Sequence, residues 1–422
     1  MRFCRGTSFL AAKLRYREKM SDCKISFLGD FMTEPGLLEQ AKTECGFDYK
    51  PVFEPLKNLL SESDYLVGNL ETPVAGAEAG YSDSLFSFNA PDEFVAALKY
   101  LGMNMMSTAN NHMLDRGFNG LVRTLTVLDD YGISHTGTYS DNNDPRRIHY
   151  FSLGQCRVAL IAYTYSTNYR LHHTALDKEH NRCVNYLKPY NAPSVSKHMK
   201  GPFDDVKAYV EELLGRTLSR HEITCLKAAM KVPIAYADDV FSQEEADEYL
   251  EYVRKDCITA KNNADIVIFY PHMGGQFNVK VGAFSEYIMN KSAEMGFDAI
   301  IGGHSHTTQR GEYIHNVPCF YSLGNVSQSP NSVYAVKETL PEYGLAVHLY
   351  VDKSKISKTA FSITKIVEDQ NTPMRVFPVD ELYDLLSDSR EKELLEKDVR
   401  TIYTRITGKE LTGSPICREY IF

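Results

Sequence analysis

The residues with the clearest chemical potential are two histidines on a short, glycine-rich loop. His304 and His306 belong to the sequence Gly-Gly-His-Ser-His at positions 302–306, which directly follows the mostly apolar run at 298–301. Histidines at alternate positions reach one metal cluster only if the loop turns sharply, which the paired glycines permit. We therefore predict that both imidazoles bind metal, with a solvated loop as the alternative.

A third histidine stands at the end of another apolar run. His272 follows residues 266–270 and precedes Met-Gly-Gly at 273–275. A lone histidine in such a place is more often buried and hydrogen-bonded than a metal ligand. The presence of His304 and His306 at another strand end favours ligation here.

Two carboxylates and an amide follow the first two apolar runs of the chain. Asp30 ends the first run, and Asn69 and Glu71 belong to Gly-Asn-Leu-Glu at 68–71. Carboxylate oxygens combined with imidazoles suit manganese, iron or zinc in a two-metal site, whereas cysteines alone would indicate structural zinc. The alternative for each residue is a helix cap or a turn.

The densest polar motif is Thr-Ala-Asn-Asn-His at 108–112, followed by Asp115 and Gly117. It lies between a predicted strand and a predicted helix. There, Asn111 offers an amide oxygen to a metal, and His112 offers an imidazole for proton transfer or oxyanion stabilisation. An Asx turn with a helix cap would use the same residues structurally.

All these residues lie where strands are expected to end. Short apolar runs alternate with helical patterns, which is typical of α/β structure, and ligands gather outside the carboxyl ends of such strands. Strands are predicted at 25–28, 65–67, 103–108, 158–163, 266–270, 299–301 and 319–322, with further β patterns at 344–351 and 359–366. Helices are predicted at 91–102 and 117–131, and a capping box of Ser242 and Glu245 begins another.

The alternation is interrupted between residues 166 and 241. This segment begins with a basic part that includes Arg170, Lys178, Arg182 and Lys188 and continues with a helical pattern at 206–214. We interpret it as an insertion that covers the site and directs cations at an anionic substrate, with a solvated loop as the alternative. The predicted parts are an N-terminal extension at 1–22, a main domain at 23–165 and 242–370, the insertion at 166–241 and a C-terminal helical segment at 371–422.

The composition argues against a general affinity for nucleic acid or anionic lipid. The 422 residues include 46 basic and 55 acidic side chains, which give a formal charge of -9. The nine cysteines show no repeated spacing that would indicate a disulfide framework. No run approaches the roughly 20 apolar residues of a membrane span, so we expect a cytoplasmic protein. Residues 1–19 are either an upstream extension or the product of a mis-assigned start, since Met20 stands just before the first strand.

The order of the motifs resembles that of the CapA family of capsule and poly-gamma-glutamate synthesis proteins. The motifs are Gly-Asp at 29–30, Gly-Asn-Leu-Glu at 68–71, Asn-Asn-His-x-x-Asp-x-Gly at 110–117, His-x-Gly at 272–274, Gly-Gly-His-x-His at 302–306 and Tyr-Ser-Leu-Gly-Asn at 321–325. Each is weak alone, but the ordered set is specific and covers residues 23–330 apart from the insertion. The resemblance implies the calcineurin-like metallophosphoesterase fold, an α/β sandwich (αββα) of two sheets flanked by helices.

The resemblance also implies roles for individual residues. The ligands of two divalent metal ions would be Asp30, Glu71, Asn111, His272, His304 and His306. The catalytic residue beside the substrate would be His112. The predicted substrate-binding residues are Asn69, Asn110, Arg170 and Arg310.

Two positions of these motifs depart from typical phosphoesterases in a way that CapA-like sequences share, and two depart from the common pattern of the family. Met32 stands where typical phosphoesterases have a second histidine, and Asn69 stands where they have a bridging aspartate, so Glu71 is expected to take the bridge. Met273 replaces a common tryptophan, and Ser305 replaces a proline between the paired histidines. Neither of the last two changes removes a ligand.

The chemistry implied by the resemblance is hydrolysis by a metal-activated water. The wider superfamily implies phosphoester hydrolysis, whereas the CapA name implies cleavage or transfer at a glutamyl amide. The competing class is a non-hydrolytic component of a polymer synthesis or export assembly, whose pocket only binds an anionic chain. In each case the expected partner is an anionic small molecule or a polyanionic polymer, and the sequence indicates no oligomeric state.

Overall fold

The strand that carries Asp30 lies in the centre of a large sheet. β1 (Cys23–Phe31) pairs in parallel with β4 (Tyr65–Leu70) and antiparallel with β13 (Tyr343–Asp352). The order across the sheet is β15-β14-β13-β1-β4-β5-β6, with β16 beside β14. Its other strands are β5 (Met105–Ser107), β6 (Ser134–Thr136), β14 (Lys355–Val367), β15 (Arg375–Pro378) and β16 (Tyr420–Ile421).

A second sheet carries the strands that precede the three histidines. Its order is β11-β12-β10-β9-β8-β7, with parallel strands in the centre and an antiparallel strand at each edge. Its strands are β7 (His149–Leu153), β8 (Cys156–Thr164), β9 (Ile266–His272), β10 (Ala299–Ile301), β11 (Gly311–Ile314) and β12 (Val317–Phe320). All the strands predicted from the sequence are therefore present in one of the two sheets.

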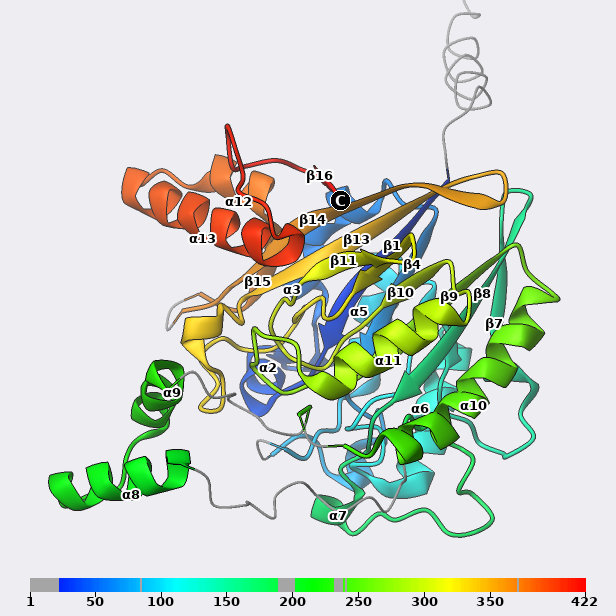
Figure 1. Ribbon diagram of the computed structural model, residues 1–422, viewed down its shortest axis with the longest axis horizontal. Helices are drawn as coiled ribbons and strands as arrows, with labels where there is room; N and C mark the ends of the chain where they lie inside the picture. Colours follow the sequence, from blue (N-terminus) through cyan, green and yellow to red (C-terminus); the bar gives the residue numbers. More distant parts are fainter. Residues whose placement is uncertain (1–22, 84–85, 189–201, 231–237, 240, 370–371) are drawn as a thin grey trace, which may run out of the picture.

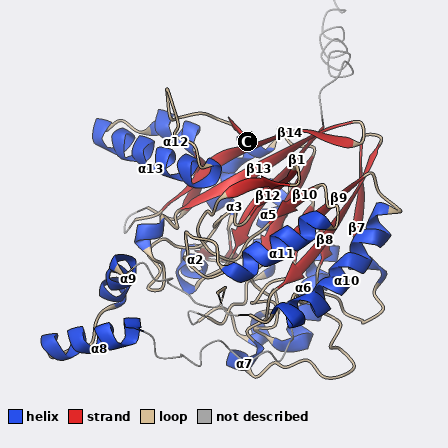
Figure 2. Cartoon of the chain, in the orientation of Figure 1, coloured by secondary structure: helices blue, strands red, loops and turns tan. Residues whose placement is uncertain are grey.

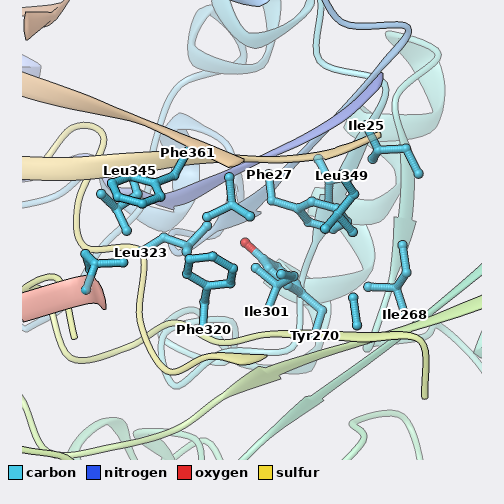
Figure 3. Close-up of a cluster of buried hydrophobic side chains, with 14 of the residues drawn as sticks. Ile25, Phe27, Ile268, Tyr270, Ile301, Phe320, Leu323, Leu345, Leu349 and Phe361 are labelled. Atoms are coloured by element: carbon cyan, nitrogen blue, oxygen red, sulfur yellow. The ribbon is translucent and has the colours of Figure 1, made fainter. Parts of the chain in front are cut away.

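The two sheets pack face to face because side chains alternate between the faces of each strand. In β8, Leu160 joins the core between the sheets, while the next residue, Ile161, joins the outer core. Figure 3 shows the inner core, in which Phe27 of the first sheet approaches Ile268 and Tyr270 of the second. The ring centroids of Phe27 and Tyr270 are 5.9 Å apart.

Helices cover the outer faces of the sheets (Figures 1 and 2). α3 (Lys50–Phe53) and α5 (Asp92–Leu101) share a core with the first sheet, and α10 (Gln243–Lys261) and α11 (Ala283–Glu294) share one with the second. The first part of the chain also contains α2 (Pro35–Gln40), α4 (Lys57–Leu60), α6 (Gly117–Asp130) and a small hairpin of β2 (Lys42–Thr43) and β3 (Gly46–Phe47). The predicted αββα sandwich is confirmed.

The predicted helix ends are correct where a cap marks them. α5 ends at Gly102, which has a left-handed conformation with φ 96°, and Gly132 follows α6 with φ 61°. α10 begins after Ser242, whose side chain accepts a hydrogen bond from the backbone N–H of Glu245. Local cap chemistry therefore fixed these boundaries.

The segment predicted as an insertion contains α7 (Tyr169–His172), α8 (Pro202–Leu214) and α9 (Arg220–Ala229). α8 and α9 project away from the sheets in Figure 1. On α8, the apolar side chains of Tyr209 and Leu213 are exposed to solvent. The predicted cap over the site is therefore represented, among the described helices of this segment, by α7.

The structure is a computed structural model, and it describes residues 23–83, 86–188, 202–230, 238–239, 241–369 and 372–422. The predicted N-terminal extension at 1–22 lies outside the described residues, as does the end of the basic segment. No helix within the described ranges is long and apolar enough to cross a membrane.

The C-terminal segment contributes strands as well as the predicted helices. α12 (Val379–Leu385) and α13 (Ser389–Thr407) form the helical part, while β15 and β16 pair with β14 in the larger sheet. Residues 371–422 are thus joined to the main sheet at both ends of their helical part.

Candidate metal centre and active-site pocket

The predicted ligands meet because strands of both sheets end at the same edge of the sandwich. Asp30 lies at the end of β1, Glu71 directly follows β4, and His272 is the last residue of β9. The loop with His304 and His306 follows β10, which is parallel to β9. The expectation that ligands gather outside the carboxyl ends of strands, here called the strand-end rule, therefore located the cluster correctly.

The nitrogen and oxygen atoms of these side chains lie close together. The Nε2 of His272 is 2.8 Å from Oδ1 of Asn111 and 3.1 Å from Nδ1 of His304. The Oε1 of Glu71 is 3.4 Å from the same His272 nitrogen and 3.6 Å from Nε2 of His306. With Asp30 Oδ2 at 3.7 Å from Nδ1 of His306, the structure brings all six predicted ligands into one buried cluster.

Glu71 belongs to both of the groups that are able to hold a metal ion. One group is Glu71, His272 and His304, the other is Asp30, Glu71 and His306, and the ligand atoms within each lie within 4.8 Å of one another. Among the described residues, the buried Oε1 of Glu71 has no hydrogen-bond partner. A buried carboxylate oxygen without a donor is costly unless a cation satisfies it. The donor set of imidazoles and carboxylates therefore fits a divalent metal ion.

The electrostatics of the cluster also favour a cation. Burial, aided by repulsion from Glu71, raises the pKa of Asp30 to about 7, and burial raises the pKa of Glu71 to about 8. Burial lowers the pKa of His272 to about 4 and that of His306 to about 3. The imidazoles are thus held neutral, as ligation requires, and the two carboxylates need a positive charge between them to ionise together.

The histidine loop has an unusual backbone conformation. His304 and His306 have φ values of 98° and 53°, and each such residue other than glycine costs about 1–3 kcal/mol, which the surrounding structure must offset. The positive φ values of this turn lie at the histidines and not at the paired glycines. The glycines provide room instead: a Cβ on Gly302 would lie 2.3 Å from the carbonyl oxygen of Tyr321, and one on Gly303 would lie 3.1 Å from Oδ1 of Asp30.

Two of the predicted substrate-binding residues lie among the ligands. The Nδ2 of Asn69 donates to Oδ1 of Asp30 at 2.8 Å. The Nδ2 of Asn110 donates to Oδ1 of Asn69 at 3.1 Å and to the carbonyl oxygen of Leu70 at 2.7 Å. Both amides are buried and are engaged in orienting the cluster.

His112 lies beside the cluster and has a carboxylate partner of its own. Its Nδ1 is 2.7 Å from Oδ2 of Asp115, which also accepts a hydrogen bond from the backbone N–H of Phe88 at 2.9 Å. Burial alone would lower the pKa of His112, but the charge of Asp115, its hydrogen bond and the charge of Glu71 together raise that pKa above its ordinary value. The other ring nitrogen, Nε2, lies 3.5 Å from Nδ2 of Asn168.

An open pocket of about 230 Å³ connects His112 with the metal-ligand loop. The pocket is lined by Phe86, His112, Tyr165, Asn168, Leu171, Gly274, Gln276 and His304. It is therefore bounded by residues of the main domain and by α7 of the inserted segment. This arrangement places a bound molecule between a candidate ligand and a candidate proton donor.

Sequence reasoning missed several of the pocket residues. The ring of Tyr165 packs against that of His304 with centroids 4.6 Å apart, and it directly follows β8, so the strand-end rule was able to identify it. Asn168 places Nδ2 at 3.3 Å from Nδ1 of His112. His172 places Nε2 at 3.3 Å from Oδ1 of Asp115. No local pattern marks these last two residues, because their partners lie more than 50 positions away in the chain.

The two predicted substrate-binding arginines have different outcomes. Arg170 belongs to α7, but its side chain lies outside the described part of the structure. Arg310 is engaged outside the cluster: its Nη2 is 2.8 Å from Glu286 and 3.0 Å from Glu312. Of the predicted cations in the insertion, Lys188 comes near the pocket wall, with its Nζ 4.7 Å from the centroid of the Tyr165 ring.

Comparison with known families gives a match over most of the chain. The model of a family described as "Bacterial capsule synthesis protein PGA_cap" matches residues 24–329. This range contains every residue of the cluster and excludes α12 and α13. The predicted resemblance to capsule and poly-gamma-glutamate synthesis proteins is confirmed.

Individual relatives are distant. "Capsule biosynthesis protein CapA" of Bacillus anthracis is 24% identical over 316 residues, which are 74% of this chain and 61% of that protein. "PGA biosynthesis protein CapA" of Bacillus subtilis is 22% identical over 303 residues, which are 71% of this chain and 62% of that protein. This chain therefore matches about three fifths of the length of these relatives.

Solved structures show a weak likeness. A putative 5'-nucleotidase from Staphylococcus aureus, solved in complex with alpha-ketoglutarate, is 14% identical with a TM-score of 0.42 over 90% of this chain and 58% of that one. A hypothetical protein from Thermus thermophilus is 13% identical with a TM-score of 0.36 over 84% of this chain and 97% of that one. Similarity at this level does not bear on function.

Proposed function

This chain belongs to the PGA_cap family of bacterial capsule synthesis proteins, and we propose that it is a metal-dependent hydrolase. The proposed substrate is an anionic phosphoester or glutamyl amide of capsule or poly-gamma-glutamate-type polymer metabolism. The observation that carries the proposal is the pair of buried ligand groups that share Glu71 and open onto the pocket beside His112. The cytoplasmic location expected from the sequence remains a prediction.

The proposed ligands are divided between the two groups. Glu71, His272 and His304, with Asn111 near His272, would hold one ion, and Asp30, Glu71 and His306 would hold the other. Bound divalent ions supply Lewis-acid activation of water and of the scissile group near neutral pH. The protein contributes buried ligands whose orientation is fixed by hydrogen bonds, such as that from Asn69 to Asp30.

His112 is the proposed proton donor to the leaving group. Asp115 holds its Nδ1 and favours the protonated imidazolium, so that Nε2 carries a proton on the side of the pocket. Phe88 helps to fix the ring, since the two ring centroids lie 4.3 Å apart. An imidazolium in this place also stabilises negative charge that develops on the substrate.

The substrate class follows from the family together with the pocket. The pocket admits one group of a substrate between His112 and His304, and Tyr165, Asn168 and Gln276 surround it. A phosphoester or an amide has an electrophilic centre and a leaving group of the required kind. Substrates with a phosphoester bond and substrates with an amide bond should therefore both be assayed in the first experiment.

The test is elemental analysis of the purified protein, followed by assays of generic phosphoesters and poly-gamma-glutamate with added manganese. We expect about two divalent ions per chain and turnover of at least one substrate class. The His112→Ala variant is the matched control, because it should retain metal and lose turnover. Metal without turnover of any substrate would favour the competing function, a non-hydrolytic binding component of a polymer synthesis or export assembly.

A further inference from the structure

Arg405 on the C-terminal helix α13 reaches the loop that carries the paired histidines. Its Nη1, which has two hydrogens to donate, lies within hydrogen-bond distance of the side-chain oxygens of Thr307 at 3.0 Å and Thr308 at 3.2 Å and of the carbonyl oxygen of Thr339 at 2.8 Å. All three threonines are buried. Since Thr307 directly follows His306, one guanidinium contacts the backbone segment that presents the candidate ligands.

The contacts of Arg405 are made with neutral oxygen atoms. A half-buried guanidinium loses part of its hydration, which costs free energy. For Arg405, four contacts with acceptor oxygens of the loop and of Thr339 offset this cost. Arginine is suited to this task because its donors are arranged in a rigid plane and its charge is weakly hydrated. The side chain therefore acts as a fixed point against which the loop is held.

Further hydrogen bonds transmit this restraint to the histidines. The Ser305 hydroxyl donates to the carbonyl oxygen of Thr307 at 2.7 Å. The Thr307 hydroxyl donates to the carbonyl oxygen of Thr339 at 2.7 Å. On the other side of the loop, Asn325 donates to the carbonyl oxygen of His306 at 3.0 Å. The two left-handed histidines thus lie between a restraint from the loop after β12 and a restraint from α13.

We propose that Arg405 is a positioning residue of the metal centre, which holds the loop at 303–306 so that both imidazoles face Glu71. The C-terminal helix then belongs functionally to the site, although it lies beyond the residues that the family model matches. This inference rests on the proposed function only in requiring that the cluster binds a divalent metal. It does not depend on which bond the protein cleaves.

The experiment compares Mn²⁺ binding by full-length variants after removal of metal with a chelator. Isothermal titration calorimetry gives the Kd, and thermal unfolding of the metal-free protein gives Tm. For Arg405→Met we expect a Kd about 10–100-fold higher than that of the wild type, the loss that is usual when a residue orienting a ligand is removed. Arg405→Lys should fall in between, because an ammonium keeps the charge but reaches fewer of the acceptors.

Arg400→Met is the matched control on the same helix. The Arg400 guanidinium donates to the carbonyl oxygens of Leu411 at 2.6 Å and Gly413 at 2.8 Å, so its loss affects helix anchoring but not the loop. Its Kd should stay within about twofold of the wild type. An equal loss of affinity in Arg400→Met would overturn the inference, because the effect would then be general to α13.

Three other results would also overturn it. If Arg405→Met lowers Tm but binds Mn²⁺ as the wild type does, the role of the arginine is stability alone. If that variant does not fold, a folded Arg405→Lys variant with wild-type affinity leads to the same conclusion. A wild-type protein that binds no Mn²⁺ would instead refute the proposed function, and the inference with it.

Discussion

Two groups of histidines lie at and near the pocket, one around His304 and one around His112, and the two groups differ in charge. On one side, His272, His304 and His306 have lowered pKa values, so they are neutral. On the other side, the pKa values of His112 and His172 are raised. Burial lowers the pKa of a histidine in both places, so burial does not explain the difference.

The difference lies in the charge of the nearby carboxylates. Asp115 Oδ2 accepts hydrogen bonds from His112 and from the Phe88 backbone, and the pKa of Asp115 is lowered by the charge of His112 despite burial. Burial instead raises the pKa of Glu71 to about 8. An ionised carboxylate therefore keeps a neighbouring imidazole protonated, whereas a carboxyl group that burial holds neutral does not.

Replacing Glu71, the carboxylate shared by the two metal-binding groups, should have the largest effect, which is a loss of affinity for metal. Glu71→Gln keeps the size of the side chain but removes the charge from both metal-binding groups. We expect affinity for Mn²⁺ to fall by more than about a hundredfold, beyond the loss caused by outer residues. Calorimetry and elemental analysis measure this effect. Asp115→Asn, at the carboxylate beside His112, is the control and should retain the metal. Two tightly bound ions in Glu71→Gln would show that the carboxylate is not shared.

Exchanging one histidine on each side should separate metal binding from proton transfer. His304→Ala should lose metal and activity together. His112→Ala should retain most of its metal while turnover falls by roughly a hundredfold or more. Metal content and kcat are measured on the same preparations. Comparable loss of metal in both variants would make His112 a ligand and remove the distinction between the two sides.

Neutralising Asp115 should lower the pKa of His112, so that its imidazole becomes neutral like those of the three histidines of the metal-binding cluster. In the native protein, the charge and hydrogen bond of Asp115, with the charge of Glu71, keep the pKa of His112 above its ordinary value despite burial. Without the Asp115 carboxylate, burial is the largest remaining influence, so in Asp115→Asn the pKa should fall below about 6.5. NMR titration of the imidazole resonances follows this change, and kcat near pH 7 should decrease by about tenfold or more. An unchanged pKa would mean that another group sets the charge of His112.

A substitution at the rim of the pocket should have the smallest effect on the kinetics. Leu171 on α7 lines the pocket and is 58% exposed. Leu171→Ser should raise KM by about two- to fivefold with little change in kcat, because it removes only a partial apolar contact. Leu385→Ser is the control, since Leu385 is 69% exposed on α12. A large fall in kcat in Leu171→Ser would show that α7 also controls the catalytic geometry.

Much of the metal side was predictable from the sequence, because strand ends converge wherever apolar runs alternate with helices. Asp30, Glu71 and His272 each belong to or follow a buried run, and their meeting needs parallel strands within each sheet and two sheets whose strands end at the same edge of the sandwich. Helix boundaries at Gly102 and Ser242 were predictable for a different reason, since caps are local chemistry. Both kinds of signal lie within a few residues of the feature that they predict.

The parts that were not predictable depend on contacts between distant segments. Arg405 has no motif around it, and its acceptors lie near positions 307 and 339. Arg310 follows the histidine loop closely, yet Glu286 and Glu312 engage it outside the cluster. Periodicity and spacing do not encode the direction of such side chains, which tertiary packing determines.

The pairing of the central strand also constrains when the protein is able to fold during synthesis. One edge of β1 pairs with β4, but on its other edge Cys23 pairs with Val351, far later in the chain. Pairings over such separations form slowly and leave strand edges exposed meanwhile. A ribosome-bound chain therefore keeps one apolar strand edge open until most of the chain has emerged. Completion of the larger sheet at that edge therefore has to wait for the synthesis of β13.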